Sequence, residues 1–235
     1  MKRVDRQESR GVSASQYLYK FIACAAVVAA VAYAPVSQAQ IVLGPSVSLA
    51  SLTNAGGDIL VGDKDFDNFT ISGDFSASQV SVTPIEENGN YGIRFSGGFL
   101  SFSQPEDMIL GYEVSVTNSP DLISSANLLF NGQVSAGTGI AAVVEQVFTN
   151  IPPAFYGQMT VFASVASNQL STSLAIAPPQ TELSINKDVQ LTAIFPAFST
   201  ISTIDQTYTQ VPEPSTVVLA VVGFCGLFLL RRRRH

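Results

Sequence analysis

Between positions 40 and 210, hydrophobic residues recur at every second position over short stretches. The segments QVSVT (79–83), LSFS (100–103) and YEVSV (112–116) alternate apolar and polar side chains, which is the period of a strand with one buried face. No stretch carries a long helical stripe. The predicted strands are 41–49, 59–61, 66–72, 79–83, 91–95, 99–103, 109–117, 126–130, 141–148, 159–165, 172–176, 182–185 and 189–195.

Turn residues separate these strands. Asn88-Gly89 is a hairpin signal, and the pairs Gly97-Gly98, Pro152-Pro153 and Pro178-Pro179 interrupt the pattern elsewhere. Short strands at about ten-residue spacing predict an all-β fold, a single antiparallel β-sandwich-like domain. The segment AAVVEQVF (141–148) leaves a short helix open as an alternative.

The N-terminus has the three parts of a secretory signal. Apolar residues 21–34 are ended by Pro35, and Ser37 and Ala39 place small side chains at positions −3 and −1 of a cleavage site. We predict a signal peptide over 1–39 and a mature chain that starts at Gln40; an uncleaved membrane anchor is the alternative. The cations that precede the apolar segment are Lys2, Arg3, Arg6, Arg10 and Lys20.

The C-terminus has a second apolar run. Residues 216–230 carry no charge, and as a helix they reach about 22 Å, against a hydrocarbon core of about 30 Å. Arg231, Arg232, Arg233 and Arg234 follow directly, and such a cluster stays on the cytoplasmic side. A transmembrane helix over 215–230 is therefore predicted. A buried core helix is the alternative, but four adjacent arginines are costly to bury.

This tail resembles the PEP-CTERM sorting signals of exported bacterial proteins. The matching residues are Val211, Pro212, Glu213, Pro214 and Ser215, followed by the apolar run and the arginines. The resemblance implies processing by an exosortase, a membrane transpeptidase that cuts near Pro-Glu-Pro, in a Gram-negative, polysaccharide-producing host. The other expected partners are signal peptidase, the inner membrane, in which the chain resides transiently, and exopolysaccharide.

The chain divides into four expected parts. They are the signal peptide at 1–39, a β-rich exported domain at 40–197, an exposed Ser/Thr-rich stalk at 198–210 and the sorting signal at 211–235. The body also resembles, more loosely, an uncharacterised PEP-CTERM family for which no activity is established. The echoing residues are Gly62-Asp63-Lys64 with Phe66 and Phe69, Gly92-Ile93 with Phe95, and Asn186-Lys187-Asp188-Val189.

Charge and residue types exclude several functions. From 40 to 210 the chain has three cationic side chains against fifteen carboxylates, a net charge of −12, so nucleic acids and anionic membrane surfaces are poor partners. Cys24 and Cys225 lie in the two targeting segments, and the single histidine is His235. The body therefore lacks a Ser-His-Asp triad, a Cys-His pair and an ordinary zinc site.

Calcium is the one cofactor for which the sequence offers a candidate set of ligands. In DKDFDNFTISGD, the carboxylates of Asp63, Asp65, Asp67 and Asp74 occupy positions 1, 3, 5 and 12 of a calcium loop. However, Asn68 stands where glycine is expected, position 9 is Ile71, and no helices flank the segment. The alternative is a strand with Phe66 and Phe69 packed inward and the aspartates solvated.

A glycosidase site and a sugar-binding surface are two further kinds of site to consider in the sequence. Two acids at a set separation could hydrolyse a glycoside, and the available acids are Glu86, Glu87, Glu106, Asp107, Glu113 and Glu145. Glu145 differs from the others because it lies in an apolar run, where burial would raise its pKa. Sugar-binding platforms are usually aromatic, and the chain has no Trp.

The expectation from sequence is a non-enzymatic exported protein, sorted to the cell surface or extracellular matrix, where it serves as a structural or adhesive biofilm component. The alternative is a calcium-dependent or polysaccharide-binding β-sandwich module.

Overall fold

A computed structural model describes residues 43–212, apart from 55, 118–119, 136 and 151–152. The predicted signal peptide, with Ser37, Ala39 and Gln40, lies outside the described residues. So do Glu213, Pro214, Ser215, the predicted helix at 215–230 and the arginines 231–234. Within the described part of the chain, no helix is long and apolar enough to cross a membrane.

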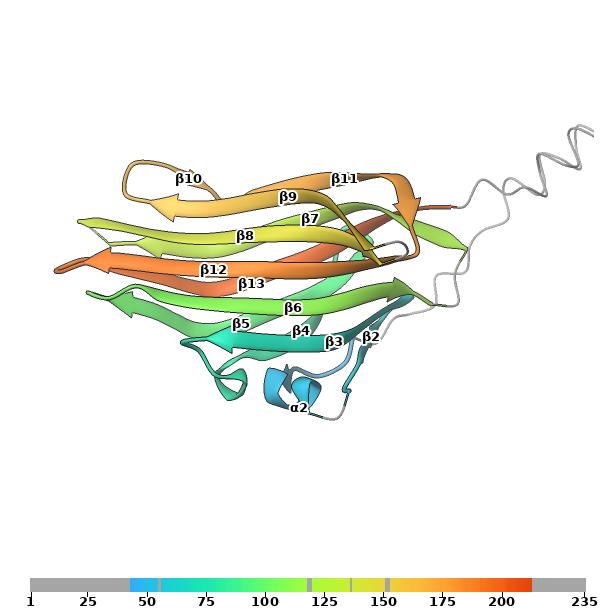
Figure 1. Ribbon diagram of the computed structural model, residues 1–235, viewed down its shortest axis with the longest axis horizontal. Coiled ribbons are helices and arrows are strands. Elements are labelled where there is room, and N and C mark those ends of the chain that lie inside the picture. Colours follow the sequence, from blue (N-terminus) through green and yellow to red (C-terminus); the bar gives the residue numbers. More distant parts are fainter. Residues whose placement is uncertain (1–42, 55, 118–119, 136, 151–152, 213–235) are drawn as a thin grey trace, which may run out of the picture. The chain divides into compact units, whose positions relative to one another are not determined.

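The described chain folds into two antiparallel β-sheets (Figure 1). The six-stranded sheet has the order β1 (Val47–Ser48), β4 (Ser81–Glu87), β5 (Asn90–Phe102), β13 (Phe198–Pro212), β7 (Asp121–Val134) and β11 (Ser171–Gln180). The seven-stranded sheet has the order β10 (Asn168–Gln169), β9 (Pro153–Ser164), β8 (Thr138–Asn150), β12 (Glu182–Ile194), β6 (Glu106–Val116), β3 (Lys64–Gly73) and β2 (Ile59–Val61). Two short helices, α2 (Leu49–Thr53) and η1 (Ala77–Gln79), complete the described elements.

One hydrophobic core lies between the sheets, because the strands of both alternate inward apolar and outward polar residues. Aromatic rings join the two layers at its centre. The Phe66 ring of β3 lies 6.0 Å from that of Tyr208 in β13, and Phe95 of β5 lies 5.7 Å from Tyr112 of β6. The predicted all-β sandwich is therefore confirmed for the described residues.

The hairpin predicted at Asn88-Gly89 joins β4 to β5, and both residues have the positive φ that a tight hairpin turn requires, 54° and 80°. The helical alternative for 141–148 is wrong, because these residues lie within β8. Gly97-Gly98 does not end a strand, since β5 continues through it. Of the strand predicted at 41–49, the described residues 43–49 contain only β1, because Ser48 caps α2 by accepting a hydrogen bond from the Ala50 amide.

The stalk predicted at 198–210 is wrong. These residues form most of β13, which pairs with β5 on one side and β7 on the other, and its inward residues Ile201, Ile204 and Tyr208 are fully buried. A Ser/Thr-rich strand of this kind is polar because its outward positions are hydroxylated, and its sparse apolar residues fill the core. The weak alternation in the sequence was the signal of a central strand.

Candidate functional site

β13 presents side chains to both surfaces of its sheet. After a register shift between Ile201 and Thr203, Asp205 and Thr207 point to the outer face, while Gln206 and Tyr208 point into the sandwich. Two polar sites therefore lie back to back on one strand. We describe the outer one first.

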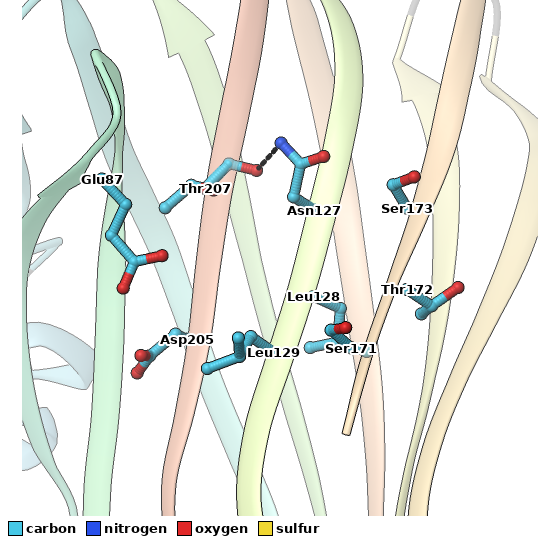
Figure 2. A pocket seen from close by; sticks show the side chains of 9 residues that line it. All are labelled: Glu87, Asn127, Leu128, Leu129, Ser171, Thr172, Ser173, Asp205 and Thr207. Carbon is cyan, nitrogen blue, oxygen red and sulfur yellow. Dashed lines mark hydrogen bonds between the residues drawn. The ribbon is translucent and has the colours of Figure 1, made fainter. Parts of the chain in front are cut away.

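A hollow of about 310 Å³ lies on the outer face of the six-stranded sheet, called the outer groove here. Strand pairing aligns Gly92, Thr207, Asn127 and Ser173 in one row across β5, β13, β7 and β11. These side chains are short, so the surface is hollowed along the row. Figure 2 shows the groove, with the carboxylates of Glu87 and Asp205 on one side and the β11 residues on the other. Its lining residues are Glu87, Asn127, Leu128, Leu129, Ser171, Thr172, Ser173, Asp205 and Thr207.

An ion pair fixes one wall of the outer groove. Arg94 Nε and Nη2 donate to the two oxygens of Asp205, both at 2.6 Å, and Glu87 lies 3.9 Å from Nη2. The hydrogen bonds to Asp205 raise the pKa of Arg94 further. Asp205 is only 2% exposed, whereas the Arg94 side chain is 39% exposed, so the carboxylate is shielded from water while the guanidinium is partly solvated.

The floor of the outer groove offers donors and acceptors without an aromatic ring among its lining residues. Asn127 Nδ2 donates to the Thr207 carbonyl at 3.4 Å (Figure 2) and also to Thr209 Oγ1 at 3.1 Å. Leu129, 40% exposed, adds an apolar patch between these polar groups. The arrangement suits a neutral, hydroxylated ligand better than a charged one.

The predicted calcium site is not assembled, and that prediction is wrong. Residues 64–73 form one extended strand, β3, so Asp65 and Asp74 lie about 30 Å apart along it, whereas Ca²⁺ ligands lie within about 2.6 Å of the ion. Asp74 instead accepts a hydrogen bond from the Asp107 amide. In the described residues, no group of three or more acidic, His or Cys side chains is placed to hold a metal ion.

Asp65 and Asp67 point outward from β3, beside Asn68, whose positive φ of 52° marks a bulge in the strand. Partial burial, and then the charge of Asp58, raise the pKa of Asp65. Partial burial raises the pKa of Asp67 as well, with repulsion from Asp65 and Glu113 adding to it. Phe66 and Phe69 pack inward, so the strand of the alternative interpretation is confirmed, whereas its expectation of solvated aspartates is not, because Asp65 and Asp67 are partly buried.

The inner site is a polar cluster buried between the sheets, called the core cluster here. Lys187 of β12 donates to Glu145 of β8 and, at 2.6 Å, to Gln206 Oε1 of β13; all three residues are 0% exposed. Burial raises the pKa of Glu145 and lowers that of Lys187, and the attraction between the two opposes both shifts. Beside them, the Tyr112 and Tyr208 hydroxyls are 2.9 Å apart.

Sequence reasoning found one member of the core cluster and missed the others. Glu145 was noticed because it interrupts an apolar run, and its predicted burial and raised pKa are confirmed. Lys187 has the same signal in its strand, because it stands between Ile185 and Val189 at the inward positions of β12. Gln206 gave no such signal, since its segment was interpreted as a stalk.

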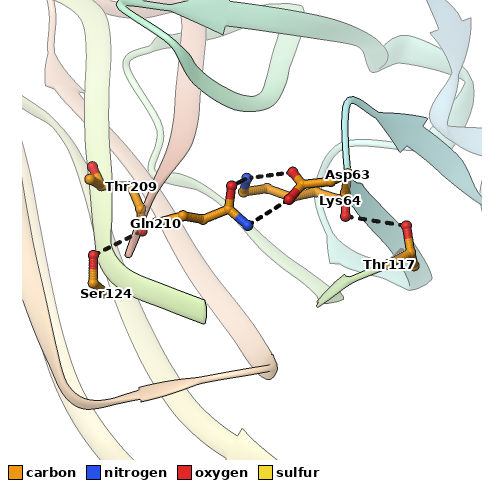
Figure 3. Close-up of polar contacts among 6 residues, drawn as sticks. All are labelled: Asp63, Lys64, Thr117, Ser124, Thr209 and Gln210. Carbon is orange, nitrogen blue, oxygen red and sulfur yellow. Dashed lines mark hydrogen bonds and ion pairs between the residues drawn. The ribbon is translucent and has the colours of Figure 1, made fainter. Parts of the chain in front are cut away.

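A third polar contact fixes the end of β13 (Figure 3). Lys64 Nζ donates to Gln210 Oε1 at 2.7 Å and to Asp63 Oδ1 at 3.1 Å, and Gln210 Nε2 donates to Asp63 Oδ2 at 2.7 Å. Gly62 precedes them with a φ of 65°, and a Cβ there would lie 2.5 Å from the Tyr91 ring. The Gly62-Asp63-Lys64 motif thus holds the strand from which the C-terminal segment departs. Val211 and Pro212 still belong to β13, paired with Leu122 and Asp121.

The PEP-CTERM protein-sorting motif matches residues 210–234. No curated protein matches the chain. Among solved structures, the chain is similar to TmCBM61 in complex with β-1,4-galactotriose (14% identity, 60% of this chain and 89% of that one, TM-score 0.29). It is also similar to the mannan-recognising carbohydrate-binding module TmCBM27 (12% identity, 73% and 100%, TM-score 0.30) and to tailspike protein 4 of bacteriophage CBA120 (12%, 60% and 19%, TM-score 0.28). At these scores, the likeness carries no argument about a ligand.

Proposed function

We propose that this chain is a non-enzymatic exported protein, sorted through its C-terminal signal to the cell surface or extracellular matrix, where it serves as a structural or adhesive component. The sorting motif at residues 210–234 carries this proposal, since it implies export, a C-terminal membrane anchor and exosortase processing. Gln210 is both the first matched residue and, through its hydrogen bonds with Lys64 and Asp63, a fixed part of the end of β13. The folded body therefore reaches up to the signal with no long tether between them.

The sorting proposal is tested in a host that carries an exosortase. We expect the full chain to leave the inner membrane, and its recovered form to lack Arg231–Arg234 by intact mass. The variant Pro212→Ala/Glu213→Ala/Pro214→Ala should remain in the inner membrane fraction with the arginines attached. Arginines retained by the wild-type protein in that fraction would overturn the proposal.

A second candidate function is binding of a neutral polysaccharide in the outer groove. The observation that favours it is a hollow of about 310 Å³ lined by hydroxyls, an amide and a guanidinium-capped carboxylate. The net charge of −12 between positions 40 and 210 disfavours acidic polymers. Hydrogen bonds to Ser171, Ser173 and Asn127, together with apolar contact to Leu129, would supply the affinity.

Retention of the full chain on the exopolysaccharide of its host tests this second function. Ser173→Trp fills the groove and should abolish retention. Gln190→Trp adds the same bulk to an exposed position of β12, in the other sheet, and should leave retention unchanged. No retention of the wild-type chain, or equal loss in both variants, would refute groove binding without touching the sorting proposal.

A further inference from the structure

The core cluster brings an amine, a carboxamide and a carboxylate together where no water reaches them. Lys187 and Glu145 are direct cross-strand partners in the seven-stranded sheet, and Gln206 faces them from the opposite sheet. Lys187 Nζ is 2.6 Å from Gln206 Oε1 and also donates to Glu145 Oε2. The amine thus touches both a carbonyl group and a proton acceptor.

Two atoms of the core cluster are unpaired within the described structure. Glu145 Oε1 and Gln206 Nε2 are buried and make no hydrogen bond of normal geometry there, although Gln206 lies close enough to Glu145 to oppose the rise in the pKa of that carboxyl group. A buried ion pair already costs several kcal/mol of desolvation per ion, and unpaired buried polar atoms add to that cost. As a purely structural device, the cluster is therefore a poor one.

We propose that Lys187 and Gln206 become joined by an intramolecular isopeptide bond, with Glu145 as the group that transfers the protons. Lys187 first passes a proton to Glu145, which leaves a neutral amine beside a carboxylic acid. Nζ then attacks Cδ of Gln206 and forms the new C–N bond. Glu145 donates its proton to Nε2 as the Cδ–Nε2 bond breaks, ammonia leaves, and the carboxylate takes the remaining proton from Nζ. No oxidant, metal or co-substrate is consumed.

The surroundings favour each step. Burial lowers the pKa of Lys187 and raises that of Glu145, and both shifts favour transfer of the proton from the amine to the carboxylate. The three groups are held by central strands of two packed sheets, and such fixed proximity replaces a bimolecular encounter. The product has no buried ions, and the unpaired Nε2 has left as ammonia.

The bond would join β12 to β13, and hence one sheet to the other, four residues before Gln210. A load applied at the C-terminal end of β13 would then pass directly into β12 rather than through the intervening residues 188–205. This suits the structural role proposed above, but the chemistry does not depend on that role.

Peptide mapping of the purified full chain tests the bond without any variant. Cleavage after glutamate yields one peptide from Leu183 to the C-terminus, because Pro214 protects the bond after Glu213, and this peptide contains both Lys187 and Gln206. We expect its mass to be lower by one ammonia molecule, and we expect trypsin not to cleave it after Lys187. Ring closure at Asn186 would also release ammonia, but it would leave Lys187 open to trypsin. A peptide of full mass that trypsin cuts would overturn the proposal, and loss of one water would instead indicate a bond to a carboxyl group.

Glu145→Gln tests whether the bond needs a proton-transferring group at position 145, because the variant leaves both Lys187 and Gln206 in the chain. This variant keeps the shape of the side chain and should yield the same peptide from Leu183 at full mass, and trypsin should cleave it after Lys187. Ser184→Ala, an outward-facing change in the same peptide, should leave the bond intact. If Glu145→Gln fails to fold, the wild-type peptide still decides the question. A bond that forms equally well in folded Glu145→Gln would refute the role given to Glu145.

Discussion

Asp205 and Gln206 are neighbours on β13, yet they take part in opposite kinds of polar site. Asp205 faces the outer groove and pairs with Arg94, whose side chain is 39% exposed. Gln206 faces inward and belongs to the core cluster, where Lys187 and Glu145 are both 0% exposed. β13 therefore contributes Asp205 to a partly exposed ion pair and Gln206 to a buried cluster that contains a second ion pair, and only the sheet separates the two.

The difference shows what the three cations of the body do. Lys64, Arg94 and Lys187 all hold β13, through Gln210, Asp205 and Gln206 respectively. On the outer face, water can solvate Arg94 if its partner is lost, so the contacts of the Arg94–Asp205 pair can change when a ligand binds. In the core, no water can replace a lost partner, so the loss of one partner there strongly destabilises the folded state.

The largest effect is expected from Lys187→Met. This change removes the amine from the core cluster, and with it the proposed bond to Gln206, and it leaves the Glu145 carboxyl group buried without its partner. It should lower the free energy of unfolding by about 3–5 kcal/mol in chemical denaturation. Lys187→Met/Glu145→Gln removes the unpartnered carboxyl group as well and should recover part of that loss. If Lys187→Met alone were as stable as the wild type, the core cluster would contribute no more to stability than the outer ion pair does.

Tyr208→Phe tests the hydroxyl pair beside the core cluster. The Tyr112 hydroxyl is buried and lies 2.9 Å from that of Tyr208, so deleting the Tyr208 hydroxyl leaves it unpaired, at a cost of about 1–2 kcal/mol. Tyr112→Phe/Tyr208→Phe should lie closer to the wild type, because neither polar group remains. The double-mutant cycle in urea measures this coupling, and additive losses would contradict it.

Asp205→Asn breaks the outward pair and should cost only about 1 kcal/mol, because Arg94 is partly solvated. If the outer groove binds polysaccharide, retention should fall in the same variant, since the guanidinium is no longer held in place. Glu87→Gln is the matched control, because this carboxylate is 3.9 Å from Arg94 and its loss should change stability by less than about 0.5 kcal/mol. A loss for Asp205→Asn as large as that for Lys187→Met would show that the outer pair is effectively buried.

The strands and the fold class could be predicted from sequence because alternation reports one buried face directly. Ile59–Val61 was predicted with its observed bounds. Predicted breaks within β5 and β12 failed for one reason: long antiparallel neighbours continue a strand across residues that locally disfavour it.

The sites were harder to predict, because their residues come from strands far apart in sequence. Glu145, Lys187 and Gln206 meet only after β8, β12 and β13 are placed in two sheets, and the row across the outer groove requires the register of four strands. The calcium prediction failed in the opposite way. It assumed that residues close in sequence would curl around an ion, whereas hydrogen bonding to β6 holds them extended.

The smallest effect belongs to the extended acidic segment, where carboxylates share an outer face. The pKa of Asp67 is raised from 3.8 by partial burial and then by Asp65 and Glu113, so the folded chain binds this proton more tightly than the unfolded chain does. Its ionisation therefore destabilises the fold above that raised pKa and has no effect at pH values below 3.8. Asp67→Asn should add about 0.5 kcal/mol to the free energy of unfolding at pH 7, a gain that shrinks as the pH falls. Asp67→Glu keeps the charge and should show no gain. If Asp67→Asn lost stability at pH 7, the Asp67 carboxylate would be stabilising the folded state. The difference in stability contribution between outward-facing charges and the core cluster would then be smaller than the structure indicates.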